Sequence, residues 1–265
     1  MPREQRTVFG EVADLYDRVR PTYPEALVDD VLALADSPVS RLLEVGPGTG
    51  KATVLFAQRG LEILALEPSA EMAAVATRNL LGFPRVSIEL STFEDWAPPS
   101  PASGLFDLLI SAQAWHWVTP GLRTVKAHQA LRPSGGLAVF WNRPRWVDQD
   151  LRAALEAVYR ARVPELDARR PGYPGLSQSE VDEDAADEMA SSGLFGSVIQ
   201  RFYPSHREYT VEEYVQLLQT QSDHRMLPPD RRDHLLQGVA DVIQAAGGGF
   251  GMEYDTHLYF AKRLP

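Results

Sequence analysis

The residues with the clearest chemical potential are a glycine loop and an acid that follows it along the chain. Residues 41–50 spell RLLEVGPGTG, in which a short apolar run leads directly into the loop. Residues 61–69 spell LEILALEPS, so a second apolar run ends at Glu67. A glycine loop lets backbone approach a ligand closely, and an acid about 20 residues further on can accept hydrogen bonds from ribose hydroxyls. The pattern predicts a nucleoside site.

The loop differs from the dinucleotide fingerprint at one place. That fingerprint uses a third glycine for close helix–strand packing and holds a pyrophosphate at the helix N-terminus. Lys51 stands where the third glycine would be, and no Tyr-x-x-x-Lys pair is evident. The spacing therefore favours a nucleoside with an amino-acid tail over the cofactor of a nicotinamide-dependent oxidoreductase, which is the rival enzyme class.

LEVGPGTG followed by ALEPS resembles the first two motifs of class I S-adenosylmethionine (SAM) dependent methyltransferases. Tyr16 and the run Arg20-Pro21-Thr22-Tyr23-Pro24 are similar to the type 11 group, which includes trans-aconitate methyltransferase-like proteins. The resemblance implies methyl transfer (EC 2.1.1.-) from SAM, with S-adenosylhomocysteine as product. It also implies an α/β, Rossmann-like class I methyltransferase fold. That fold has a seven-stranded, mostly parallel sheet of order 3-2-1-4-5-7-6, N-terminal cap helices and a helical lid.

The same resemblance assigns residues to the cofactor. Glu44 would hold the methionine amino group, Thr92 and its neighbours would recognise adenine, and Tyr16 and Arg20 would form a cap. The family often has Asp where this chain has Thr92, which leaves the contact to the adenine amino group open between Thr92 and Glu94. The full set is Tyr16, Arg20, Glu44, Gly46, Gly48, Gly50, Glu67, Pro68, Met72, Thr92, Phe93, Glu94, Ser111 and Ala112.

Aromatic residues gather where the methyl acceptor would bind. All five tryptophans follow the carboxyl ends of the expected third, fourth and fifth strands, at positions 96, 115, 117, 141 and 146. His116 lies beside the expected methyl position, and its unperturbed pKa near 6.5 suits a general base; a carboxylate nucleophile would need none. Arg143, Arg145 and His206 could present a positive rim to an acidic acceptor. The expected acceptor-binding residues are Trp115, His116, Arg143, Trp146 and His206.

The amino-acid composition limits the classes of binding partner that we expect. Asp and Glu number 36 against 26 Lys and Arg, for a net charge of -10, which disfavours a nucleic-acid surface. Without cysteine there is no disulfide and no thiolate zinc site, and no metal is expected. The charged N-terminus and the lack of a long apolar run predict a cytoplasmic protein with no membrane span.

We expect a small-molecule acceptor and a monomer or homodimer. O-methylation of a carboxylate or hydroxyl is favoured, and C- or N-methylation stays open. The non-enzyme alternative is a SAM-binding module without an acceptor pocket.

Strand-like and helix-like runs alternate, which indicates a parallel sheet covered by helices. The expected strands are Leu42–Val45, Glu62–Leu66, Val86–Leu90, Phe106–Ile110, Leu137–Trp141, Val198–Tyr209 and Gly251–Lys262. The expected helices are Glu4–Val19, Glu25–Ala35, Ala52–Arg59, Ser69–Leu80, Leu122–Leu131, Asp148–Val163, Glu180–Ser191, Val211–Thr220 and Pro229–Ala246, with a loop over Pro164–Gln178. One domain, 1–265, is expected, with cap helices in 1–36, the SAM-binding core in 37–146, a helical lid in 147–246 and the last strand in 247–265.

Overall fold

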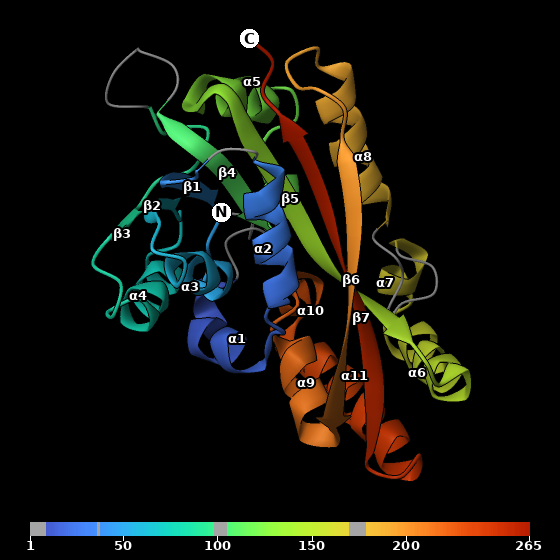
Figure 1. Ribbon diagram of the computed structural model, residues 1–265. Coiled ribbons are helices and arrows are strands. Elements are labelled where there is room, and N and C mark those ends of the chain that lie inside the picture. Colours follow the sequence, from blue (N-terminus) through green and yellow to red (C-terminus); the bar gives the residue numbers. More distant parts are fainter. Residues whose placement is uncertain (1–8, 36–37, 98–104, 170–178) are drawn as a thin grey trace. The chain divides into compact units, whose positions relative to one another are not determined.

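The computed structural model describes residues 9–35, 38–97, 105–169 and 179–265. Its strands form a seven-stranded sheet, which Figure 1 shows. The sheet order is β3-β2-β1-β4-β5-β7-β6, as expected from the resemblance. β3–β2, β2–β1, β1–β4 and β4–β5 are parallel pairs. The strands are β1 Arg41–Val45, β2 Glu62–Leu66, β3 Val86–Glu89, β4 Phe106–Ala112, β5 Leu131–Trp146, β6 Ile199–Thr210 and β7 Gly249–Lys262.

Most expected helices are present. The α-helices are α1 Ala13–Val19, α2 Glu25–Leu34, α3 Lys51–Ala57, α4 Ala70–Asn79, α5 Leu122–Ala130, α6 Gln149–Arg162, α7 Pro164–Arg169, α8 Ser179–Ser191, α9 Val211–Gln219, α10 Ser222–Met226 and α11 Pro229–Ala245. Short 3₁₀ turns are η2 Gly10–Val12 and η3 Trp115–Trp117. Ser69 caps α4, because its hydroxyl accepts from the Met72 amide. Residues 4–8 of the first expected helix and 170–178 of the expected loop lie outside the described residues.

Three elements differ from the expectation. Residues 164–169 form α7 and not a loop, because proline at the first position of a helix loses no intrahelical hydrogen bond. The short helix α10 was not predicted. β5 extends from Leu131 to Trp146, and its pairing with β4 is irregular: Phe106 pairs with Leu131 but Leu108 pairs with Gly136. Residues 131–136, LRPSGG, which precede the expected strand Leu137–Trp141, lie within that irregularity.

Alternate residues of the central strands face opposite sides of the sheet, as a period of two requires. Leu43 and Leu109 belong to a core that includes residues of α5 and α8, whereas Leu42 and Leu108 belong to a core with residues of α2 and α3. Glu44 has the same parity as Leu42, so the strand places it on the α3 side. The sheet is therefore covered on both faces.

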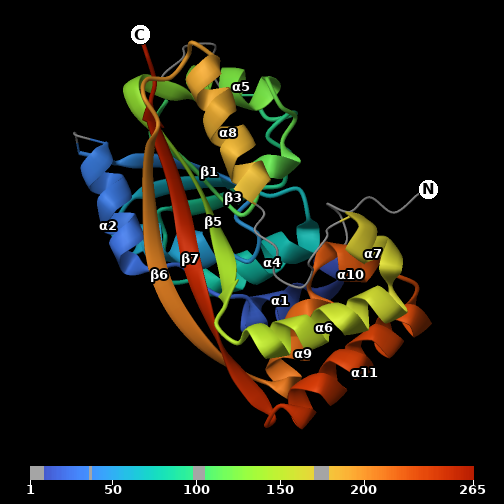
Figure 2. The same cartoon turned by 90° about the vertical axis from the view of Figure 1, so that its right-hand side faces the viewer.

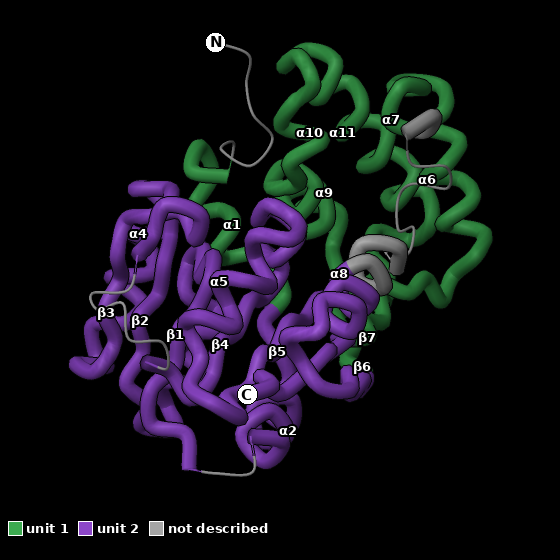
Figure 3. Tube along the Cα trace, turned by 90° about the horizontal axis from the view of Figure 1, so that it is seen from above, with its two compact units in different colours: residues 1–21, 143–178, 204–255 green, residues 22–142, 179–203, 256–265 purple. Residues whose placement is uncertain are grey.

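The chain divides into two compact units, each built from three separate segments (Figure 3). Unit 1 comprises residues 1–21, 143–178 and 204–255, and unit 2 comprises residues 22–142, 179–203 and 256–265. The two expected cap helices fall in different units, since α1 belongs to unit 1 and α2 to unit 2. The helix α8, expected in the lid, belongs to unit 2.

Unit 1 has a core of its own. Its helices α6 and α11 pack together, and α11 also packs on α9 (Figure 2). Trp146, Tyr209, Tyr214 and Phe250 form an aromatic cluster there, with Trp146 stacked on Phe250 at 5.2 Å between ring centroids. None of the helices in the described ranges is both long enough and apolar enough to cross a bilayer.

Candidate functional site

The glycine loop of unit 2 connects β1 to α3 and has a backbone that favours glycine. Gly46, Gly48 and Gly50 have φ values of 71°, 59° and 86°, in the left-handed region that residues with a Cβ rarely adopt. A Cβ on Gly46 would lie 2.5 Å from the Ala114 Cβ, and one on Gly48 would lie 3.3 Å from Met72 Cε. The loop therefore packs closely against the segment after β4 on one side and against the first turn of α4 on the other.

Glu67 follows β2 and is buried behind this loop. One carboxylate oxygen accepts from the Gly48 amide and the other from the Ser69 amide, both at 2.9 Å. Burial raises the pKa of Glu67, and the two backbone donors oppose the shift. A carboxylate has about four lone-pair sites, so each oxygen can accept one further hydrogen bond. Pro68, the next residue, is exposed.

Glu44, at the end of β1, is fully buried. Its two carboxylate oxygens have no hydrogen-bond partner among the described residues, and neither do the buried hydroxyls of Thr49 and Thr53. Burial raises the pKa of Glu44 to about 7, and the charge of Glu67 adds to the shift. The nearby hydroxyl of Thr53 on α3 lowers the pKa of Glu44 and so offsets part of the increase, although the two groups are not in hydrogen-bond geometry. A buried carboxyl of this kind is costly unless a ligand or water satisfies it.

The residues after β3 make local contacts. The Thr92 hydroxyl donates to Asp95 Oδ2 at 2.7 Å and accepts from the Asp95 amide. Phe93 is buried in the core. One oxygen of Glu94 accepts from both the amide and the hydroxyl of Thr119 at 3.0 Å. Thr92 and Glu94 therefore both have protein partners, and neither side chain is singled out for adenine.

The segment after β4 contains a strained residue. Ser111 is buried and donates from its hydroxyl to the Val45 carbonyl at 2.9 Å, which ties the end of β4 to the end of β1. Ala112 ends the strand, and Gln113 has a φ of 58° without being glycine. Such outliers cost free energy and cluster at functional sites. Nothing in the residue types around Gln113 predicts this conformation.

His116 lies in the turn η3, and its ring is oriented by a tryptophan. Trp141 on β5 is fully buried, and its indole N–H donates to His116 Nδ1 at 3.2 Å. Because an indole nitrogen can only donate, Nδ1 is the acceptor and the proton of the neutral imidazole lies on Nε2. Trp115 is fully buried, with Phe93 at 6.2 Å between ring centroids, so its ring belongs to the core and offers no surface to an acceptor.

The remaining predicted residues lie in unit 1. Arg20 donates to the Thr220 hydroxyl and carbonyl, both at 2.8 Å, and its guanidinium lies over the Tyr16 ring. These contacts fasten α1 to the end of α9. The assignment of Tyr16 and Arg20 to a cofactor cap stays a prediction.

The expected acceptor residues of unit 1 are largely committed to other contacts. Trp146 is 4% exposed within the aromatic cluster. His206 Nε2 pairs with Glu208 at 2.7 Å, and Arg145 pairs with Glu253 and Asp255. Arg143 is buried. Two of the three members of the expected positive rim, Arg145 and His206, therefore pair with carboxylates.

A separate hollow of about 150 Å³ lies at the amino ends of β1, β2 and β4, lined by Arg41, Glu62 and Phe106 among others. Ligands of open α/β sheets bind at the carboxyl ends of the strands. The glycine loop, Glu44 and Glu67 all lie at those ends, so this hollow is not the candidate site.

Comparison with known proteins agrees with the geometry. Residues 42–135 match the family model described as a methyltransferase domain. An uncharacterized methyltransferase of Mycobacterium tuberculosis is 36% identical over 140 residues, which are 53% of this chain and 54% of the relative. This part of the chain is therefore similar to methyltransferase domains. The chain spans about half the length of that relative.

Solved structures agree with the methyltransferase fold. A structure described as a type II methyltransferase from Anaeromyxobacter dehalogenans has a TM-score of 0.61 at 21% identity, covering 93% of this chain and 99% of that chain. Haemonchus contortus phosphoethanolamine N-methyltransferase 2, solved with phosphomonomethylethanolamine and S-adenosylhomocysteine, has a TM-score of 0.52 at 14% identity, covering 97% of this chain and 58% of that one. At these identities the likeness is one of fold alone.

Proposed function

We propose that this chain binds SAM in unit 2 and transfers its methyl group to a small organic acceptor. The observation that carries the proposal is Glu44, a fully buried carboxyl beside the glycine loop with no partner among the described residues. A cationic ligand would satisfy it, and the amino group of an amino-acid tail is such a cation. When bound, SAM would supply a methyl group on an activated sulfonium centre.

The chain's own residues would hold and orient the ligand. Gly46, Gly48 and Gly50 give the loop a left-handed backbone that residues with a Cβ rarely adopt, and Glu67 keeps one lone-pair site on each oxygen for the ribose hydroxyls. Glu44 would pair with the amino group. Met72, whose Cε lies over Gly48, would pack on the base. The site would be completed at the ends of β3 and β4 by Thr92, Phe93, Glu94, Ser111 and Ala112.

The acceptor is proposed to be a carboxylate, with a hydroxyl as the second choice. His116 has its Nδ1 engaged by Trp141, so its Nε2 carries a proton and supports a donor role toward an anionic oxygen. An ionised carboxylate needs no general base, whereas a phenol or carbon acid does. C- or N-methylation would need a base from elsewhere in the chain.

Two assays test this proposal. SAM should raise the melting temperature and NAD should not, because only a ligand that binds the folded state stabilises it. Release of S-adenosylhomocysteine should then be followed with a panel of small carboxylic acids, phenols and amines, and carboxylic acids should give base-labile methyl esters. Stabilisation by NAD alone would overturn the methyltransferase assignment, and exclusively N- or C-methylated products would overturn the choice of a carboxylate.

A further inference from the structure

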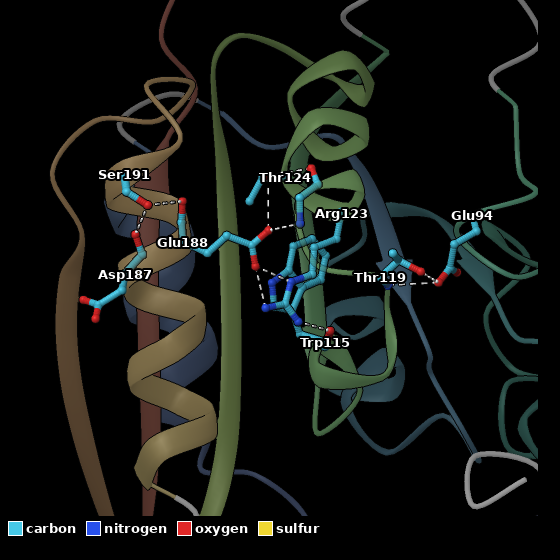
Figure 4. A network of polar contacts seen from close by, with 9 residues as sticks. Glu94, Trp115, Thr119, Arg123, Thr124, Asp187, Glu188 and Ser191 are labelled. Atoms are coloured by element: carbon cyan, nitrogen blue, oxygen red, sulfur yellow. Dashed lines mark hydrogen bonds and ion pairs between the residues drawn. The ribbon is translucent and has the colours of Figure 1, made fainter.

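A polar network centred on Arg123 and Glu188, two residues outside the proposed cofactor set, holds the turn η3 (Figure 4). Arg123, in the first turn of α5, is 5% exposed, and its Nη1 donates to the Trp115 carbonyl at 2.8 Å. The guanidinium carbon also lies 5.7 Å from the centroid of the Trp115 ring. The Arg123 side chain thus contacts both the backbone and the ring of Trp115, the residue that precedes His116.

Glu188 on α8 completes this network (Figure 4). Its Oε2 accepts from Arg123 Nε at 2.6 Å and lies 2.5 Å from Arg123 Nη2. Its Oε1 accepts from the Gly121 amide at 2.6 Å and from the Thr124 hydroxyl at 3.3 Å. One carboxylate therefore fixes the guanidinium and the beginning of α5 together, and it comes from a helix 65 residues further along the chain.

A buried ion pair such as that of Arg123 and Glu188 contributes little net free energy to folding. Removing two charges from water is costly, and well-packed apolar side chains often serve stability as well or better. What the pair does provide is geometry, because the planar guanidinium presents its donors in a fixed fork to the carboxylate and keeps Nη1 directed at the Trp115 carbonyl. The network holds the backbone of η3 in one place.

Two further contacts hold the same turn from other sides. Trp141 on β5 donates to His116 Nδ1. Glu94, after β3, accepts from the amide and hydroxyl of Thr119, two residues beyond the turn. The His116 ring is thus oriented by β5, while the backbone that carries it is fixed by Arg123, Glu188 and Glu94.

We propose that Arg123 and Glu188 are positioning residues for methyl transfer: they hold η3 so that His116 keeps its place beside the transferred methyl group. This inference rests on the proposed function, which assigns His116 to that place. It makes α8 a required part of the acceptor side of the site, although α8 contributes no residue to the predicted cofactor or acceptor sets.

The chain offers a matched control at the amino ends of the strands, away from the candidate site. Arg132 Nε lies 2.5 Å from Asp107 Oδ1, and Asp107 also accepts from the Ser40 and Arg41 amides. This second arginine–carboxylate pair fixes the amino ends of β1 and β4. Its loss tests the general effect of breaking such a pair in unit 2 without touching η3.

The experiment uses the full chain with [methyl-¹³C]SAM and ¹⁵N-labelled tryptophan. Two signals are recorded by NMR: the bound methyl group and the Trp141 indole N–H, the latter assigned with Trp141→Phe. In Arg123→Lys and Glu188→Gln we expect the dissociation constant of SAM to be unchanged, the Trp141 indole signal to move, and the methyl signal to shift toward its position in His116→Ala. Arg132→Lys should leave both signals at their wild-type positions.

If a single substitution prevents folding, the pair Arg123→Met with Glu188→Met removes both charges and leaves no buried charge without a partner. It should fold and show the same displaced signals. Wild-type positions of both signals in folded Arg123→Lys and in the double variant would overturn the inference. Failure of the wild type to bind SAM would instead overturn the proposed function, and the Trp141 indole signal would still report whether Arg123 and Glu188 hold η3.

Discussion

At the residue scale, Glu44 carries a free-energy cost that depends on pH. Its pKa is raised from 4.5 to about 7 by burial, so between these values the folded state binds more protons than the unfolded state. Stability must therefore fall as pH rises through this window, by about 3 kcal/mol if the whole shift is realised. Above pH 7 the folded protein holds a buried, ionised carboxylate.

We expect Glu44→Gln to remove this dependence, because an amide does not titrate. Without ligand, the free energy of unfolding of the wild type should fall between pH 4.5 and 7 relative to that of the variant, and the variant should be the more stable protein at pH 8. Denaturant titration at several pH values measures both. Parallel curves for the two proteins would mean that Glu44 is satisfied inside the folded chain.

His116 permits a test based on which nitrogen is replaced. Glutamine can place an N–H near the position of Nε2, whereas asparagine reaches only as far as Nδ1. Trp141 engages Nδ1, so only a residue that replaces the Nε2 donor can still orient the acceptor. We expect His116→Gln to keep a substantial part of the turnover with the acceptor found in the panel, and His116→Asn to lose about 10-fold or more because the acceptor is no longer held in line. Equal, large losses in both variants would indicate a general base instead.

The geometry of the candidate site was predictable where it follows from local sequence and not where it follows from a distant contact. Glu67 and the loop glycines could be found from motif spacing, since strand, loop and acid are neighbours along the chain. The hydrogen bond between Trp141 and His116 joins residues that are 25 positions apart in the sequence, and the hydrogen bond between Arg123 and Glu188 joins residues that are 65 positions apart. Such pairs depend on packing, and Arg123 has no sequence context that distinguishes it from an exposed helical arginine.

At the element scale, the loop between β1 and α3 should tolerate no side chain at its centre. We expect Gly48→Val to abolish SAM binding, because its φ is 59° and a branched side chain would enter the space beside Met72. Gly60→Val is the matched control, since Gly60 has a φ of 78° with no atom within 4 Å of a Cβ. Both variants carry backbone strain, but only the first should lose SAM binding in calorimetry. Retained binding by folded Gly48→Val would refute the assignment of the loop.

The type of most elements followed from the hydrophobic periodicity of the sequence. The residues at which the elements begin and end often did not. The central strands alternate between two cores, which makes runs such as Leu42–Val45 easy to recognise. β5 continues to Trp146, five residues past its expected end, where Arg143 and Trp146 are buried in a different unit. α10 is only five residues long, so it contributes too little periodicity to be recognised.

At the scale of the whole molecule, the two units have separate cores, and Trp146 tests that of unit 1. Its indole stacks on Phe250 and lies against Tyr214. We expect Trp146→Ala to lower the free energy of unfolding by about 3–5 kcal/mol, and Trp146→Phe by less than about 1.5 kcal/mol because stacking is kept. Denaturant titration distinguishes the two. A negligible effect of Trp146→Ala would mean that the indole is not part of the packed core.

The sheet order of the whole molecule came from the resemblance and not from the periodicity, because alternation says which residues are buried but not which strands are neighbours. The division into units could not be foreseen either. Each unit joins three stretches of chain, and no change of composition marks where β5, β6 and β7 pass from one to the other.

The central claim is that unit 2 binds SAM through Glu44 and the glycine loop, and calorimetric titration of SAM and S-adenosylhomocysteine tests it most directly. Both ligands should bind the wild type. At pH 6, in buffers of different ionisation enthalpy, binding should release close to one proton, because a cation beside Glu44 favours its ionised form; Glu44→Gln should bind more weakly and release none. Absence of binding by either ligand to the folded wild type would contradict the account.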